Sequence, residues 1–69
     1  MKYFSFEDAY GLGLIARNPT RDWTRIRAHL SEDARQIADE IISPGHAKGE
    51  VKSAADDLRK FAENVRESS

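Results

Sequence analysis

Two glycine-containing segments are the parts of this 69-residue chain whose residue types could carry chemistry. The run Gly11-Leu12-Gly13-Leu14-Ile15-Ala16 has the letters of a dinucleotide fingerprint, in which glycines let the backbone approach a pyrophosphate at a helix start. That site needs a buried apolar strand before the glycines and a long helix after them. No such strand precedes this run, and Pro19 leaves almost no helix after it. We therefore interpret Gly11 and Gly13 as positions of close helix packing.

The second segment, Gly45-His46-Ala47-Lys48-Gly49, combines two glycines and a lysine ahead of a predicted helix. Helix N-termini attract phosphate, so such a loop could cradle an anion. It lacks the order of glycine, lysine and hydroxyl that a P-loop needs. We interpret it as a plain helix connection, with a contact loop for a partner as the alternative.

Nucleophilic, acid–base and metal chemistry have little support in the residue types. The chain has no cysteine, and its two histidines, His29 and His46, lie 17 positions apart, which is no metal-ligand spacing. The carboxylates are expected on exposed helix faces beside basic residues, where nothing raises the pKa as a general acid requires. We expect a protein that is not an enzyme and that uses no cofactor and no metal.

The overall charge is nearly balanced, with 11 Lys and Arg against 12 Asp and Glu. A polyanion-binding surface over the whole molecule is therefore not expected, although a local patch is compatible with this balance. The first residues do not follow the basic, apolar, small-residue order of a secretory signal. The longest uncharged stretch, Ala9 to Ala16, is far shorter than the roughly 20 residues that span a bilayer. We expect a soluble, cytoplasmic protein.

Helix signals begin early in the chain. Ser5 and Asp8 resemble a capping box, which predicts a first helix from about Phe6 to Arg17, ended by Asn18 and Pro19. Residues 9–16 are apolar almost all the way round, which is typical of a helix buried on more than one side.

A second helix is predicted after Pro19, with Thr20 as its N-cap and an apolar stripe of Trp23, Ile26 and Leu30. Alternation over residues 25–30 also fits a half-buried strand. We favour the helix, because a lone strand has no partner in this chain.

The two later helices have clearer patterns. Ser31 is predicted to cap a third helix with an apolar stripe from Ala34 to Ile42, and residues 43–49 have turn chemistry. A fourth helix, about Glu50 to Arg66, has the spacing of a coiled-coil seam and outer pairs at i,i+4. The seam residues are Val51, Ala54, Leu58, Phe61 and Val65, the outer pairs are Lys52 with Asp56, Asp56 with Lys60 and Arg59 with Glu63, and residues 67–69 are expected to fray.

These elements predict an all-α fold, a bundle of three to four short helices in a single domain over residues 1–69. A domain this small has a marginal core, and without disulfides or a metal it needs another source of stability. We therefore expect a homodimer. The residues expected in the dimer contact or in close helix packing are Tyr10, Gly13, Leu14, Leu58 and Phe61.

Charge is distributed unevenly along the middle of the chain. Residues 17–29 carry four arginines against one aspartate, whereas residues 31–42 carry four carboxylates against one arginine. On a helix Arg21, Arg25 and His29 would share a face, and Trp23 could stack on Arg27. Arginine beside an aromatic residue is typical of binding hot spots. The candidate partner-binding residues are Arg17, Arg21, Trp23, Arg25, Arg27 and His29.

Three interpretations of this charge remain open: solvated faces that pair within the bundle or across a dimer, a contact with an acidic protein surface, and a contact with nucleic acid. The first functional hypothesis is a non-catalytic regulator or inhibitor that docks on a larger protein through charged helix faces. Small inhibitors encoded by mobile elements or phages have this general character.

The alternative hypothesis is a DNA-binding transcriptional regulator. The run Ala34 to Ala38, followed by Val51 and Leu58, resembles in outline the positioning and reading helices of helix-turn-helix domains. The resemblance covers about 25 residues. The connection over residues 43–49 is longer than the usual turn of about 3–4 residues, and Asp56 and Asp57 would repel phosphates.

Overall fold

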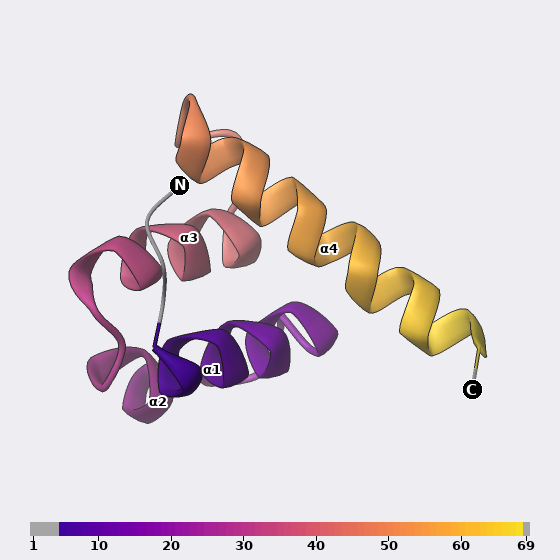
Figure 1. Cartoon of the computed structure of the whole chain (residues 1–69), viewed down its shortest axis with the longest axis horizontal. Helices are drawn as coiled ribbons and strands as arrows, with labels where there is room; N and C mark the ends of the chain where they lie inside the picture. Colours follow the sequence, from indigo (N-terminus) through magenta and orange to yellow (C-terminus); the bar gives the residue numbers. More distant parts are fainter. Residues whose placement is uncertain (1–4, 69) are drawn as a thin grey trace.

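The computed structural model describes residues 5–68 of the chain, with side chains up to residue 64. The described residues form four helices: α1 (Phe6–Arg17), α2 (Thr24–Ala28), α3 (Glu32–Ile42) and α4 (Glu50–Ser68). In Figure 1, α3 and α4 lie above α1, and α2 lies below them beside the start of α1. Helices α1, α3 and α4 pack against one another, and α2 packs on α3. The all-α architecture predicted from the sequence is confirmed.

Helix α1 has the predicted bounds, because Ser5 caps its start and Pro19 ends it as the sequence predicts. Ser5 at the N-cap accepts a hydrogen bond on its hydroxyl oxygen from the backbone N–H of Asp8, at 3.2 Å. At the other end, the N–H of Asn18 donates to the carbonyl of Ile15 before Pro19 stops the ladder. The Asp8 carboxylate makes its main contact at the start of α3, with Ser31. The backbone N–H of Ser5 adds a smaller lowering of the pKa of Asp8, as a capping box predicts.

Helix α2 is shorter than predicted and begins at Thr24, so the prediction of Thr20 as its N-cap is wrong. The reason is local. The carboxylate of Asp22 accepts hydrogen bonds from the backbone N–H of Thr24 at 3.0 Å and from its hydroxyl at 2.6 Å, forming a turn that starts the helix there. The alternative of a strand over residues 25–30 is also excluded, because residues 24–28 are helical.

Helix α3 follows the sequence prediction closely. The hydroxyl oxygen of Ser31 accepts from the N–H of Ala34 at 3.3 Å, and Glu32 and Asp33 occupy the first turn, where the helix dipole favours negative charge. Its apolar stripe faces the other helices and supplies four of the most buried side chains in the described part of the chain: Ala34, Ile37, Ala38 and Ile41.

Helix α4 buries a different stripe from the predicted seam. Ala55 is fully buried and Ala62 is 1% exposed, whereas Phe61 is 58% exposed. The seam was predicted from the alternating spacing of three and four residues, and it is confirmed only in part, because the side of α4 that carries Ala55 and Ala62 is the more deeply buried. Val51, Ala54 and Leu58 pack at the edge of this contact, and Val65 lies outside the described side chains. The helix continues to Ser68, beyond the predicted end at Arg66.

The core is built mainly from small side chains. Of the ten buried apolar residues among the described side chains, five are alanines and the rest are Leu12, Ile15, Leu30, Ile37 and Ile41. Alanines let helix axes approach closely but bury little apolar area each, so the core is tight and small. The radius of gyration, 11.1 Å, equals the value of about 11 Å expected for a compact chain of this length. None of the described helices is long and apolar enough to cross a membrane.

Candidate functional site: an apolar groove beside a cationic segment

An apolar groove lies between α1 and α2. Its volume is about 180 Å³, and its lining residues are Phe6, Glu7, Tyr10, Gly11, Ile26, His29 and Leu30. Cavities that enclose a small-molecule substrate usually hold about 300–1,000 Å³. The groove therefore suits a single side chain of a partner better than a substrate.

The rim of the groove is formed by two aromatic rings that the helix leaves in solvent. Phe6 and Tyr10 are one helical turn apart, and their rings stack at a centroid distance of 6.1 Å. Phe6 is 82% exposed and Tyr10 61%. Such a pair exposes far more apolar surface than a scattered hydrophobic residue, and contiguous patches of this kind mark interaction sites.

Gly11 forms the floor of the groove because nothing larger fits there. A Cβ at this position would lie 2.9 Å from Cδ2 of Leu30 and 3.3 Å from Cγ2 of Ile26. The predicted role of Gly11 in close packing is confirmed. For Gly13 close packing within the chain is wrong, because a Cβ there would meet nothing within 4 Å. Its backbone faces open space on the outer side of α1.

The cationic segment, residues 17–29, lies next to this groove. Arg17, Arg21, Arg25 and His29 are exposed. The prediction that Arg21 and Arg25 share a helix face is wrong, because Arg21 precedes α2 and lies in the turn that leads into it. Only Arg25 and the residues after it are positioned by the helix or by its last turn.

Trp23 is half-buried, and its indole ring makes two contacts that hold it in place. Its indole Nε1 donates to the backbone carbonyl of Asn18 at 2.7 Å. The guanidinium of Arg21 lies 5.3 Å from the centre of its ring, within the range of a cation–π interaction. The predicted stacking of Trp23 on Arg27 is therefore wrong, and Arg21 makes that contact instead.

Arg27 binds a residue of the neighbouring helix. Its Nε and Nη2 donate to the two carboxylate oxygens of Asp39 on α3, at 2.6 and 2.8 Å. This bidentate geometry holds the pKa of the Asp39 carboxyl below its usual value, because the hydrogen bond to Arg27 favours the charged form. For this one residue, the interpretation of charged faces that pair within the bundle is correct.

The residues proposed for dimer contact or close packing lie on two helices, two of them on α4 and three on α1. Leu58 is half-buried and packs against the core from α4, while Phe61 on the same helix is exposed. Tyr10, Gly13 and Leu14 all lie on the side of α1 that faces away from the core, with Gly13 and Leu14 half-buried.

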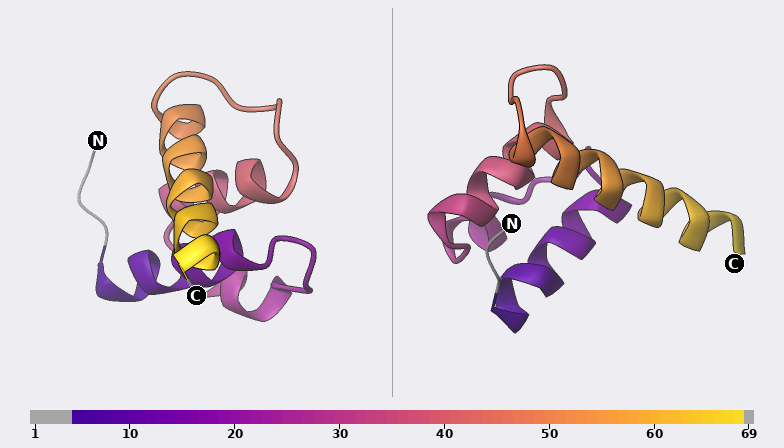
Figure 2. Two further views of the ribbon diagram at one scale, coloured as in Figure 1. Left: turned by 90° about the vertical axis from the view of Figure 1, so that its right-hand side faces the viewer. Right: turned by 45° about the horizontal axis from the view of Figure 1, so that its top comes forward.

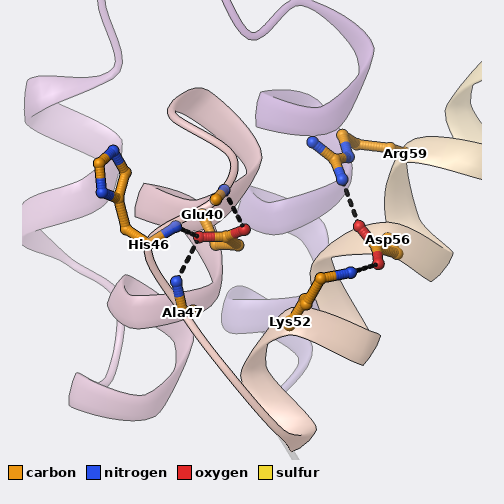
Figure 3. Close-up of polar contacts among 7 residues, drawn as sticks. Glu40, His46, Ala47, Lys52, Asp56 and Arg59 are labelled. Atoms are coloured by element: carbon orange, nitrogen blue, oxygen red, sulfur yellow. Dashed lines mark hydrogen bonds and ion pairs between the residues drawn. The ribbon is translucent and has the colours of Figure 1, made fainter.

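Glu40 was not recognised from the sequence as a special residue. Only 2% exposed, it accepts on its carboxylate the backbone N–H groups of Gly45 at 2.8 Å, His46 at 3.0 Å and Ala47 at 2.8 Å (Figure 3). These bonds lower its pKa. The glycine-containing loop does cradle an anion, but the anion is the protein's own carboxylate. Gly45 reaches this geometry with a φ of 101°, which a residue with a side chain rarely adopts.

Asp8 is the second buried carboxylate, 6% exposed. It accepts the backbone N–H of Ser31 at 3.0 Å, and this bond lowers its pKa. The expectation that the carboxylates lie on exposed helix faces is therefore wrong for Asp8 and Glu40. A general acid needs a raised pKa, whereas the pKa values of these two carboxylates are lowered. Their contacts are with backbone N–H groups, so both residues stabilise the backbone around them.

On α4, the carboxylate of Asp56 accepts from Lys52 at 2.7 Å, as predicted for an i,i+4 pair, and also from Arg59 (Figure 3). The predicted pairs of Asp56 with Lys60 and of Arg59 with Glu63 are replaced by this cluster. Among the residues that the structure describes, no group of three or more His, Asp or Glu side chains could hold a metal ion.

Comparison with protein family models, curated proteins and solved structures finds no match to this chain. The functional argument therefore depends on the geometry of the groove and of the cationic segment.

Proposed function

We propose that this chain is a non-catalytic protein-binding regulator, which docks on an acidic surface of a larger protein through the cationic segment and the adjoining apolar groove. The observation that carries the proposal is the contact between Arg21 and Trp23, with the guanidinium 5.3 Å from the ring centre. Arginine and tryptophan dominate the energetics of many protein interfaces, and a pair that is already oriented loses less entropy on binding.

The surroundings of this pair support a protein partner. Arg25 adds positive charge, and the ring of His29 adds a hydrogen-bonding group at the groove, while Phe6 and Tyr10 supply exposed apolar area. An acidic partner surface with one protruding apolar side chain would complement both the cationic segment and the apolar groove. We also propose that the protein acts as a homodimer, since a small alanine-rich core leaves four large apolar side chains exposed in the part of the chain that the structure describes: Phe6, Tyr10, Ile42 and Phe61.

A DNA-binding role has less support. Helix α3 follows α2 directly, and its first turn carries the exposed carboxylates of Glu32 and Asp33, which would repel phosphates. In the pair of helices that resembled a helix-turn-helix unit, the connection between Ile42 and Glu50 is a long loop closed on Glu40.

The test is capture of partners from a lysate of the native host with tagged wild-type protein and with the variant Arg21→Glu/Arg25→Glu. The matched control is Lys48→Glu/Lys60→Glu, which makes the same charge change at exposed positions outside the segment. We expect the control to retain a protein partner that the arginine variant loses. Retention of every partner by the arginine variant would contradict the assignment.

Two further measurements complete this test. The captured partner is titrated against the fluorescence of Trp23, the only tryptophan in the chain, which should change on docking. In parallel, binding to a generic DNA duplex is measured at low and high salt. Tight DNA binding that falls steeply with salt, without a captured protein, would favour the transcriptional regulator instead.

A further inference from the structure

Helix α1 carries a second apolar face, which is exposed at Phe6 and Tyr10 and half-buried at Leu14. It shares Phe6 and Tyr10 with the rim of the groove, so a dimer through this face and a partner docked in the groove would both contact these two rings. Its core face is formed by buried residues that include Leu12 and Ile15. The opposite face presents Phe6, Tyr10, Gly13 and Leu14, at the i, i+4, i+7 and i+8 spacing of one helix side. Figures 1 and 2 show α3 and α4 together on one side of this helix.

The shape of this face allows another helix to approach closely. Tyr10 and Leu14 stand one turn apart, and the backbone of Gly13 beside them is open, with nothing within 4 Å of the place a Cβ would take. A glycine flanked by large apolar side chains forms a notch into which a knob from a facing helix can fit. Gly11 serves the same purpose on the inner side, toward Leu30.

The charges along α1 indicate what the facing helix is. Glu7 and Arg17, both exposed, lie five residues before and five residues after Leu12, while Tyr10 and Leu14 lie two residues before and two after it. A two-fold axis level with Leu12 would set two copies of α1 antiparallel. It would bring Tyr10 of each copy level with Leu14 of the other, and Glu7 of each level with Arg17 of the other. Parallel packing would place like charges together.

We propose that two copies of this chain associate through the outer face of α1, antiparallel and in this register. The inference rests on the proposed homodimer and names the surface that forms it. A two-fold contact is self-complementary by construction, and this face supplies apolar and charged complements to itself. A 12-residue helix is about 18 Å long, so the contact is smaller than the roughly 800 Å² per partner of a standard interface. The dimer should therefore dissociate in the micromolar range.

The experiment is analytical ultracentrifugation of the full chain from low-micromolar to near-millimolar concentration. Wild-type protein should show a monomer–dimer equilibrium. Glu7→Arg and Arg17→Glu should each weaken the dimer about tenfold, because each sets like charges face to face twice. Mixing the two variants should restore association as a heterodimer, since one then carries only positive and the other only negative charge at these positions. The weakening of each variant alone depends on the antiparallel register, because in a parallel pair the wild type already sets like charges together. Recovery on mixing shows that these positions face each other across the contact.

Control variants separate the possible failures. Circular dichroism checks that each charge variant remains helical, and Tyr10→Glu should abolish the dimer. Phe61→Glu, on an exposed position of α4, should leave it unchanged. If Phe61→Glu dissociates the dimer and Tyr10→Glu does not, the homodimer stands but its interface lies on α4, and the inference is overturned. A wild-type monomer at every concentration overturns both the inference and the proposed homodimer, while the partner capture described above still tests the regulator.

Discussion

The carboxylate of Asp8, in the first turn of α1, accepts a hydrogen bond from the backbone N–H of Ser31, 23 residues further along the chain, at 3.0 Å. Ser31 is itself the N-cap of α3, with its hydroxyl oxygen bound to the N–H of Ala34. One buried side chain thereby fixes the start of α3 relative to the start of α1. The groove between α1 and α2 depends on this relationship, because Leu30, which lines the groove, immediately precedes Ser31.

Removing the Asp8 acceptor should destabilise the fold and distort the groove. Asp8→Ala leaves the N–H of Ser31 without its partner in a partly buried place, which carries part of the desolvation cost of that group. We expect the midpoint of thermal unfolding to fall by roughly 5–10 °C for a chain of this size. Asp8→Asn, which keeps an oxygen acceptor, should lose about half as much. Circular dichroism melting curves test this, with Asp57→Ala at an exposed position of α4 as the control. Equal losses for the alanine and asparagine variants would contradict the acceptor role.

The Glu40 carboxylate should determine whether the loop between α3 and α4 has one conformation. In Glu40→Gln an amide NH₂ takes the place of one carboxylate oxygen, so it meets either the N–H of Gly45 or those of His46 and Ala47 as donor against donor. We expect the protection of these three amides against hydrogen exchange to fall at least tenfold, measured by NMR. Glu63→Gln, exposed on α4, should leave them unchanged. Persistent protection in the Glu40 variant would show that the loop is held by other contacts.

Stability should decrease in acid, and the same two buried carboxylates should contribute to this loss. The pKa values of Asp8 and Glu40 are lowered in the folded state by backbone N–H donors. Between the folded and the ordinary pKa of about 4, the unfolded chain binds more protons, so the free energy of unfolding rises with pH. Their contribution is complete above the ordinary pKa and is lost as pH falls through the lowered values. Urea unfolding from about pH 6 to about pH 2.5 should show this loss, and Asp8→Asn/Glu40→Gln should reduce it. An identical pH profile in the double variant would assign acid unfolding to other groups.

The helices that the sequence predicted well are those whose end signals act locally. Ser5 and Ser31 cap the helices they were expected to cap, and Pro19 ends α1 where proline must. Helix α2 is shorter than the sequence predicts. Thr20 is an acceptable cap, but the hydrogen bonds between Asp22 and Thr24 start the helix later, with Trp23 at the N-cap. Competing local signals of similar strength cannot be ranked without the structure.

The candidate site was predicted in composition but not in arrangement. The arginine-rich segment and its tryptophan were visible, but which arginine meets Trp23 depends on where α2 begins. The buried roles of Asp8 and Glu40 were missed because their partners are backbone N–H groups, which every residue except proline carries and which leave no mark in the sequence. The glycine at position 45, which the structure shows with a positive φ, is a local sequence signal that could have indicated the Glu40 turn.

Arg25 and Arg27 should separate binding from folding. Arg27 is held by Asp39 in a bidentate ion pair at the surface, so Arg27→Ala should loosen α2 from α3 and lower the melting temperature by a few degrees at most. Arg25→Ala should leave the melting temperature unchanged and weaken partner binding about tenfold, as expected for one interface arginine. Melting curves and titration of the captured partner measure the two effects. If Arg27→Ala weakened partner binding more than Arg25→Ala did, Arg27 and not Arg25 would be the interface residue.

Gly11 and Gly13 offer a matched pair, because the same substitution on the same helix meets opposite surroundings. Alanine is favoured over glycine within a helix by about 1 kcal/mol. At Gly13 the new methyl group meets open space, so Gly13→Ala should raise the free energy of unfolding of the monomer by about 0.5–1 kcal/mol. At Gly11 it would lie 2.9 Å from the buried side chain of Leu30, so Gly11→Ala should gain nothing or lose stability. Urea unfolding at low protein concentration measures both variants as monomers.

In the ultracentrifuge at high concentration, Gly13→Ala should weaken self-association while Gly11→Ala leaves it intact, because only Gly13 faces outward. Stabilisation of both variants to the same extent would mean that α1 and α2 separate readily, and the groove between them would then not be a fixed feature of the fold.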